Sequence, residues 1–313
     1  MAALRRDHRR ALPLLAGAWS ATRIEDADVV VCSTSNWAHG LRTSAPTLVY
    51  CHAPARWLYQ SERYLGADRG LRRSALGLLR RPLLSWDQRA ARRASRYIVN
   101  SSVVRDQVAA VYGRSASVVP PPPALGPAGE RAALPGIEPG YLLTVSRLLP
   151  YKNVDALVEA MRVLPDERLL VAGDGPLEAR LRDSAPASVT FLGRVDDPTL
   201  RALYAGCAAL VCASYEDFGL TPLEAAGFGK PTVALRAGGY LDTIVPEVTG
   251  VLVDSPAPSA LAAGVRAMRA RPWDPDAIHS RAAEFGPERF VARLRELAAE
   301  TAAGGREVGA CAG

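Results

Sequence analysis

The feature that most constrains the fold is an alternation of two hydrophobic patterns along nearly the whole chain of 313 residues. Short, continuous apolar runs, typical of buried strands, alternate with longer segments in which apolar residues recur at helical spacing. Parallel strands need crossover connections of helix length, so this alternation favours parallel sheets covered by helices. The sequence therefore predicts the α/β class.

The expected strands fall into two series, separated by a stretch rich in Pro and Gly. Four prolines at 120–123 begin this stretch and Gly140 ends it, as in a linker. The expected strands are 28–32, 47–51, 97–100 and 116–119, then 141–145, 168–172, 189–192, 209–212, 231–235 and 250–253, with helices between them, for example over 154–164 and 222–228. We therefore expect two Rossmann-like domains that face each other across a cleft.

The expected boundaries follow from these patterns. The first domain, the linker, the second domain, a closing helix and a tail cover 1–123, 124–140, 141–286, 287–303 and 304–313. The closing helix is amphipathic, with Phe290, Leu294 and Leu297 on one face. The tail consists of small and polar residues, and we expect it to be disordered.

Bulk properties exclude several classes of protein. The chain has no apolar run of about 18 residues, the length that a membrane-spanning helix needs. Residues 1–10 are charged and lack the apolar core of a signal peptide. Both observations predict a cytoplasmic protein.

The five cysteines are scattered through the chain. Cys32, Cys51 and Cys212 lie in or at the end of apolar runs, which indicates buried free thiols. Cys207 and Cys212 have the wrong spacing for a zinc knuckle, and no His lies nearby. We therefore expect no metal site.

The net charge is +6, and the basic residues are almost all Arg, with Lys152 and Lys230 the two lysines. The densest basic stretch runs from Arg69 to Arg96. It can face anionic lipid at the inner membrane surface or a phosphorylated acceptor, or it can be a solvated helical face. Nucleic acid is not expected as a partner, because exposed aromatic residues do not alternate with these arginines.

Ligands of such sheets bind beyond the carboxyl ends of the strands, and one motif follows the expected strand 141–145 directly. In this loop Arg147 and Lys152 precede a helix that starts near Asn153. Cations are unfavourable at the positive end of a helix, but a bound anion resolves the conflict. The loop is therefore a candidate site for a diphosphate, with a pair of surface cations as the alternative.

Two further motifs follow the next two expected strands. Gly173-Asp174-Gly175-Pro176 lacks the third Gly of a dinucleotide fingerprint, so it is either a tight turn that lets a nucleotide approach the backbone or a turn before a Pro-initiated helix. Arg194 and Val195, in the run Phe191–Val195, can present backbone groups to the edge of a base. Gly173, Arg194 and Val195 are therefore the candidate base-binding residues.

The most specific motif runs from Glu216 to Glu224 and follows the expected strand 209–212. Gly219 lets backbone amides approach a ligand. Thr221 is expected to cap a helix, with Pro222 at its first position. Glu224 is then either a capping-box carboxylate or the acceptor for both ribose hydroxyls, while Glu216 faces a sugar.

One motif lies in the first series, where Tyr50-Cys51-His52-Ala53-Pro54 follows a strand. A single His is more often structural than functional. The position of His52 at the end of a strand favours a functional role, in the cleft.

Together these motifs, S-R-L-x-x-x-K, G-D-G-P, F-L-G-R-V and E-x7-E, resemble family 4 retaining glycosyltransferases, which have the two-domain GT-B fold. The runs Y-C-H-A-P-A-R-W-L-Y, R-L-L-P-Y-K-N-V-D and E-D-F-G-L-T-P-L-E are similar to GDP-mannose-dependent mannosyltransferases of polysaccharide assembly. The resemblance covers about residues 10–300.

The resemblance implies a role for each candidate residue and transfer of mannose from GDP-mannose to a glycan or lipid-linked acceptor. It implies no metal and no cofactor besides the donor, and it leaves front-face attack and double displacement both open. The implied sites are Arg147 and Lys152 for the donor diphosphate, Glu224 for the ribose, Glu216 and His52 for catalysis, and the backbone at Phe218, Gly219, Leu220 and Thr221 for the sugar and phosphate.

The chain departs from this family at its start, where no Gly-rich turn between a strand and a helix precedes Asp28. We therefore expect the first domain to be incomplete. The prolines at 120–123 are also not followed by the family's usual acidic residue. These departures keep a non-catalytic, nucleotide-sugar-binding remnant open as an alternative, alongside a UDP-sugar-dependent transferase. An NAD-dependent oxidoreductase is suggested only by Gly173 and Gly175.

Overall fold

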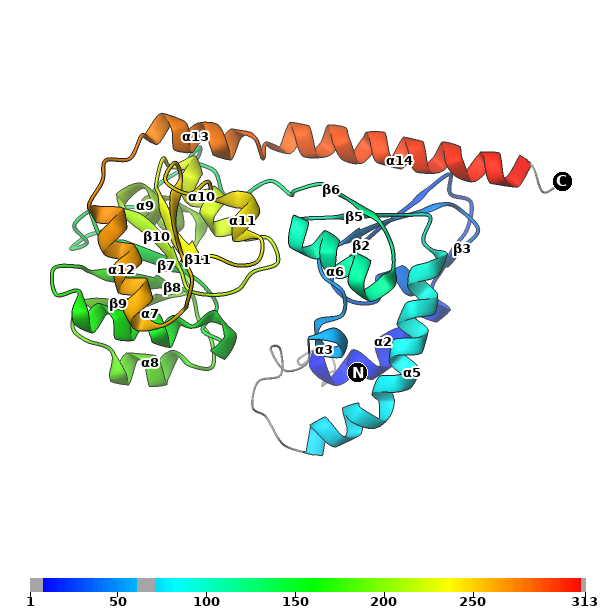
Figure 1. Ribbon diagram of the computed structural model, residues 1–313, viewed down its shortest axis with the longest axis horizontal. Helices are drawn as coiled ribbons and strands as arrows, with labels where there is room; N and C mark the ends of the chain where they lie inside the picture. Colours follow the sequence, from blue (N-terminus) through cyan, green and yellow to red (C-terminus); the bar gives the residue numbers. More distant parts are fainter. Residues whose placement is uncertain (1–7, 61–70, 311–313) are drawn as a thin grey trace. The chain divides into compact units, whose positions relative to one another are not determined.

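The computed structural model describes residues 8–60 and 71–310 (Figure 1). The chain divides into two compact units, one formed by residues 1–120 together with 290–313 and the other by residues 121–289. Each unit has its own parallel sheet. The predicted α/β class is confirmed.

The second unit contains a six-stranded parallel sheet with the order β9-β8-β7-β10-β11-β12. Its strands are β7 Leu142–Val145, β8 Leu169–Ala172, β9 Val189–Gly193, β10 Ala209–Cys212, β11 Thr232–Leu235 and β12 Gly250–Val253. Counted within the unit, this is the order 3-2-1-4-5-6 of a Rossmann sheet. The chain moves outward in one direction after β7 and in the other from β10, so the order of strands reverses between these two neighbours.

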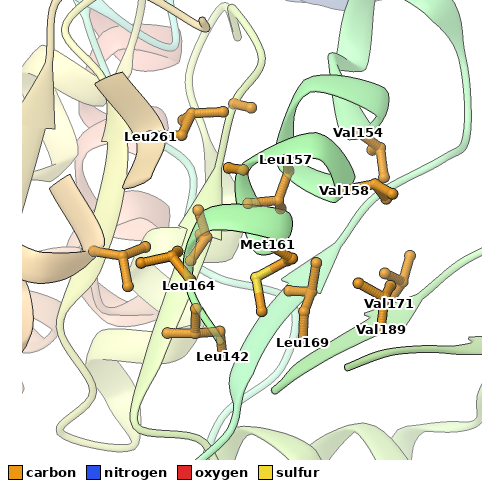
Figure 2. Close-up of a cluster of buried hydrophobic side chains, with 14 of the residues drawn as sticks. Leu142, Val154, Leu157, Val158, Met161, Leu164, Leu169, Val171, Val189 and Leu261 are labelled. Atoms are coloured by element: carbon orange, nitrogen blue, oxygen red, sulfur yellow. The ribbon is translucent and has the colours of Figure 1, made fainter. Parts of the chain in front are cut away.

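Helices cover both faces of this sheet. One face packs against α7 Val154–Ala160, α8 Glu178–Ser184 and α12 Pro258–Arg269. The other face packs against α9 Asp197–Gly206, α10 Leu220–Gly227 and α11 Tyr240–Thr243. Helix α13 consists of residues Pro275–Ala283. Figure 2 shows the first face, where Leu157 and Met161 lie over Leu142 and Leu169. Leu143 points to the opposite core, as side-chain alternation along a strand requires.

The helix predicted over 154–164 is shorter than expected. The α-helix ends at Ala160 and continues as a 3-10 turn, η3, over Met161–Val163. Pro165 explains the early end, because the residue before a proline disfavours the α conformation.

Residues 124–140, expected as a linker, pack against the second unit. Leu125 is buried in the core cluster beside α9 and α10, and Leu134 and Ile137 lie against the same cluster. The side chain of Arg168 donates hydrogen bonds to the backbone carbonyls of Glu138 and Pro139. Apolar residues within this Pro- and Gly-rich stretch therefore fix it to the unit.

The first unit contains a four-stranded parallel sheet with the order β2-β4-β5-β6. The elements of residues 8–118 in this unit are α2 His8–Ala21, β1 Arg23–Ile24, β2 Val30–Thr34, η1 Ala38–Gly40, β3 Arg42–Thr43, β4 Thr47–Cys51, α3 Arg56–Tyr59, α5 Leu71–Arg93, β5 Arg96–Val99, α6 Ser102–Tyr112 and β6 Ala116–Val118. Strands β1 and β3 pair with each other and lie outside the four-stranded sheet. The strand predicted at 28–32 therefore starts two residues later. The thiols of Cys32, Cys51 and Cys212 are buried as predicted, and Cys311 lies outside the described residues.

The basic stretch predicted from Arg69 to Arg96 corresponds largely to α5, and residues 69–70 lie outside the described part of the chain. This helix continues through Pro82, although proline removes a backbone donor. Leu83 is buried in the core of the first unit and Trp86 packs against the same cluster. Tertiary packing therefore outweighs the local preference to end the helix.

The closing helix, α14 Pro287–Ala310, is longer than the predicted 287–303. The tail expected from residue 304 is therefore helical as far as Ala310, and residues 311–313 lie outside the described part of the chain. As predicted, Phe290, Leu294 and Leu297 share one face, which packs against Leu48, Tyr50, Ile98 and Val119 of the first unit.

Candidate functional site

The candidate site of the second unit lies where the strand order reverses. The loop after β7 contains η2 Pro150–Lys152, and the loop after β10 contains Glu216. The Lys152 ammonium donates a hydrogen bond to Glu216 Oε1, although 64 residues separate the two. Both side chains are largely buried, with 15% and 25% of their surface exposed. The sheet order brings together the predicted diphosphate-binding and sugar-binding residues, in the crevice where open α/β sheets bind ligands.

Three residues that the sequence did not single out hold this pair in place. The hydroxyl of Ser214 donates a 2.7 Å hydrogen bond to Glu216 Oε1, and the hydroxyl of Tyr240 lies 3.2 Å from Ser214 Oγ. The side-chain amide of Asn153, a residue with a φ of 52°, donates to the carbonyl of Ala213 at 2.9 Å. Their positions in the sequence were the available signal, since Ser214 lies two residues after the end of β10 and Tyr240 follows the Gly-Gly turn after β11.

Arg147 lies in the same loop as Lys152, and its side chain is exposed. Its guanidinium donates to the Tyr151 hydroxyl at 3.4 Å. The Lys152 ammonium lies 5.2 Å from the centre of the Tyr151 ring. The loop therefore offers one exposed and one largely buried cation at the switch point.

The glycines of the G-D-G-P turn lie in close contact with the backbone of a neighbouring loop. A Cβ on Gly173 would lie 2.0 Å from the carbonyl oxygen of Ser146, and one on Gly175 would lie 2.5 Å from that of Leu148. The loop after β7 therefore occupies the space beside these Cα atoms, and the approach of a nucleotide to this turn stays a prediction. These glycines let the loops after β7 and β8 pack backbone to backbone.

The remaining base-region residues lie just beyond the end of β9. Arg194 forms an ion pair with Asp174 at 3.1 Å, and its side chain is 81% exposed. Val195 packs against the core beside α9, so only its backbone is available to a ligand. Gly173, Arg194 and Val195 all lie at the carboxyl edge of the sheet, beyond β8 and β9.

The predicted start of the next helix is wrong by two residues. Helix α10 begins at Leu220, with Gly219 before it, so Thr221 and Pro222 lie inside its first turn and Thr221 does not cap it. The Thr221 hydroxyl lies instead 3.7 Å from the thiol of Cys212. The Phe218 side chain is buried against Phe285, which leaves its backbone for ligand contact.

Glu224 is buried within α10, and the capping-box alternative is wrong for it. Its carboxylate accepts a 2.8 Å hydrogen bond from the Tyr204 hydroxyl and further bonds from the backbone of Leu125 and Ala124. Burial raises the pKa of Glu224, and these hydrogen bonds oppose the rise. Glu224 thus connects α10 to the segment that enters the second unit.

His52 follows β4 in the first unit, at the carboxyl edge of that sheet. Its Nε2 lies 2.8 Å from the Ser33 hydroxyl, and Asn100 donates to its backbone carbonyl at 3.3 Å. Burial, followed by the positive charge of Arg56, lowers the pKa of His52. The imidazole is therefore neutral near pH 7.

Metal-binding groups and membrane-spanning helices can be assessed for residues 8–60 and 71–310. Within these ranges no group of three or more His, Cys, Asp or Glu side chains is arranged to hold a metal ion. None of the helices described there combines the length and the apolar character that crossing a membrane requires.

Both units match known sequence families. Residues 133–284 match the glycosyl transferases group 1, and residues 2–122 match Glycosyltransferase Family 4. The chain resembles family 4 glycosyltransferases of the GT-B fold. D-inositol 3-phosphate glycosyltransferase of Segniliparus rotundus is 31% identical over 204 residues, which cover 57% of this chain and 45% of that protein. The matches span less than half the length of the curated relatives.

Solved structures support the same fold. Sucrose-phosphate synthase from Thermosynechococcus elongatus matches with a TM-score of 0.65 and 22% identity, covering 98% of this chain and 80% of that one. HepE from Anabaena, solved in complex with UDP, matches with a TM-score of 0.60 and 22% identity, covering 83% of this chain and 72% of that one. The two Rossmann-like domains predicted from the sequence are consistent with these neighbours.

Proposed function

We propose that the protein is a retaining glycosyltransferase that transfers a hexose to a glycan or a lipid-linked acceptor. The hexose is mannose, and its donor is GDP-mannose. The observation that carries this proposal is the Lys152–Glu216 pair at the switch point of a 3-2-1-4-5-6 sheet. The pair places a cation for a diphosphate beside a carboxylate for a sugar, and a nucleotide sugar carries these two groups next to each other.

The chemistry of the donor matches these side chains. The bond that breaks joins the anomeric carbon to the diphosphate, so negative charge grows on the leaving group while the sugar becomes oxocarbenium-like. Arg147 chelates two phosphate oxygens, and Lys152 adds a mobile point charge. These two cations supply the positive charge that the leaving group needs, so the proposal includes no metal and no cofactor besides the donor.

The carboxylates contact the two ends of the donor. Glu216 and the backbone of Phe218, Gly219, Leu220 and Thr221 contact the transferred sugar and its phosphate. Glu224 accepts from the ribose hydroxyls, since a carboxylate that already has three donors in the structure still acts only as an acceptor. The base lies against Gly173, Arg194 and Val195.

His52 belongs to the first unit and is assigned to the acceptor side of the reaction. As a neutral imidazole it can accept a proton or donate a hydrogen bond to a sugar hydroxyl. The hydroxyl of Ser33, 2.8 Å away, fixes the ring. Front-face attack and double displacement both remain compatible with these groups.

A UDP-sugar donor is the second candidate. The observation that favours it is the similarity to the HepE structure, which contains UDP. Both candidates use the same diphosphate and ribose contacts and differ at the base.

Calorimetric titration tests the proposal. The full chain is titrated with GDP-mannose, UDP-glucose, UDP-GlcNAc and NAD, and then again as Lys152→Ala and Glu224→Ala. We expect selective binding of GDP-mannose that either substitution abolishes. Ser184→Ala, which removes an exposed hydroxyl bonded to the carbonyl of Arg180, is the control and should bind like the wild type. If the folded chain binds none of the sugar nucleotides, the proposal is refuted.

A further inference from the structure

A row of hydroxyl groups leads from the core of the second unit to Glu216. Tyr240 is 1% exposed and Ser214 is 5% exposed, so both are buried within the protein. The Tyr240 hydroxyl lies 3.2 Å from Ser214 Oγ, which in turn lies 2.7 Å from Glu216 Oε1. The same carboxylate oxygen also accepts a hydrogen bond from Lys152.

The direction of the hydrogen bonds in this row follows from its end at the carboxylate. A serine hydroxyl carries one proton, and Ser214 donates it to the carboxylate, which is an acceptor. With that proton engaged, the bond between Tyr240 and Ser214 uses the phenol proton, and the thiol of Cys212 is a second hydrogen-bond partner of the same phenol. Burial keeps the pKa of Tyr240 well above its ordinary value, so the phenol retains that proton.

The backbone around the row is also fixed. The amide of Gly239 donates to the carbonyl of Glu216 at 2.8 Å, and this bond joins the loop after β11 to the loop after β10. Tyr240 is the first residue of α11, directly after Gly239. Tyr240 therefore lies next in sequence to a residue that is hydrogen-bonded to the backbone of Glu216.

The two partners of the carboxylate differ in what happens when a donor enters. Lys152 is the group assigned above to the diphosphate, and an ammonium on a flexible stem can exchange one anionic partner for another. Ser214 is buried, and the proposed function gives it no contact with a phosphate. Once Lys152 turns to the diphosphate, Ser214 is the side chain of this cluster that still holds Glu216.

We propose that Ser214, oriented by the hydroxyl of Tyr240, is a positioning residue that keeps the Glu216 carboxylate directed at the transferred sugar while Lys152 binds the diphosphate. This inference rests on the proposed function and extends it to two buried residues that it does not assign to the nucleotide or the sugar. It separates binding of the nucleotide from binding of the sugar, because Ser214 acts only on the sugar-facing group.

The test compares the affinities for GDP and GDP-mannose by calorimetry in the full chain. Ser214→Ala removes a charge-assisted hydrogen bond and should lower the ratio of GDP-mannose affinity to GDP affinity by about tenfold. Tyr240→Phe removes only neutral hydrogen bonds, those to Ser214 and Cys212, and should lower the ratio by about threefold. GDP affinity should stay within about twofold of the wild type, because the phosphate contacts are intact.

Tyr141→Phe is the matched control. This substitution also removes a buried phenol hydroxyl, which donates to the carbonyl of Leu203 at 2.9 Å. Tyr141 precedes β7, so it lies at the amino ends of the strands and the candidate site lies at their carboxyl ends. Its affinity ratio should equal that of the wild type. If Ser214→Ala does not fold, Tyr240→Phe carries the test alone, with its melting temperature compared with that of Tyr141→Phe.

The outcomes separate this inference from the proposed function. If the wild type binds no sugar nucleotide, the proposed function and this inference both fail. If it binds only a UDP-sugar, the ratio compares the affinity for that UDP-sugar with the affinity for UDP. If the wild type binds the donor and both variants keep its affinity ratio, only the inference fails. If a folded variant loses GDP and GDP-mannose affinity equally, Ser214 supports the whole loop, and the positioning role is refuted.

Discussion

Substituting Gly238 by Ala tests how the loop after β11 sets the position of Glu216. Gly238 has a φ of +64°, and a Cβ added to it would lie 2.1 Å from the carbonyl oxygen of Glu216. The contacting atom is backbone, so it cannot rotate away as a side chain would. Either the loop containing Glu216 moves, or the turn after β11 does.

Two costs combine in this variant. An L-residue in the left-handed region costs about 1–2 kcal/mol. Overpacking by one methyl group against a fixed neighbour costs about 1–3 kcal/mol. The free energy of unfolding should therefore fall by about 2–5 kcal/mol, which corresponds to a loss of at least about 4 °C in melting temperature for a unit of this size.

Gly136→Ala is the matched control, because Gly136 also has a positive φ, +74°, but nothing lies within 4 Å of its added Cβ. It carries only the first cost. Thermal unfolding of both variants, followed by donor titration, measures the difference. We expect Gly238→Ala to melt at least about 2 °C below the control and to lose donor affinity, since relief of the contact displaces Glu216. Equal melting temperatures and equal donor affinities in the two variants would refute the reasoning.

Three further predictions use other parts of the chain. Arg147→Lys keeps the charge but loses the planar fork, so donor affinity by calorimetry should fall about tenfold; an unchanged affinity would contradict bidentate phosphate binding. Because burial, followed by Arg56, lowers the pKa of His52 from 6.5, the unfolded state binds that proton more tightly and stability should fall as the pH drops below 6.5. His52→Gln should flatten this part of the curve of melting temperature against pH, and an unaltered slope would contradict the shift. Leu157→Ala should lower the free energy of unfolding by about 2–5 kcal/mol in chemical denaturation, because Leu157 is 1% exposed, whereas Leu241→Ala, at a side chain 53% exposed, should have little effect.

The sheet of the second unit was predictable because its inner strands β8, β7 and β10 are buried on both faces. Such strands appear as continuous apolar runs, for example Leu169–Ala172, in which every residue is buried. Their predicted bounds agree with the structure to within one residue. The edge strand β2 of the first unit alternates buried and exposed residues, and its predicted start was two residues early. An alternating strand gives a weaker signal at its ends.

The contacts of the site were not predictable from local patterns. Lys152 and Glu216 meet only because the sheet order makes β7 and β10 neighbours, and no local pattern encodes that order. The sequence marked Gly173 and Gly175 as a turn, but the atoms that fill the space beside them belong to another loop. Helix α10 starts at Leu220 because Gly219 adopts a positive φ there, while the pattern of Thr and Pro favoured a later start.

The choice of lysine at position 152 connects the resting site to its proposed action. The chain uses arginine almost throughout, yet the cation that meets Glu216 is one of its two lysines. An arginine there would bind the carboxylate through a rigid, bidentate fork, and this would hold both groups in the resting pair. A lysine makes a single-point contact on a flexible stem and can move to a phosphate at lower cost. The carboxylate then needs a second partner that stays in place, and the buried hydroxyls of Ser214 and Tyr240 provide it.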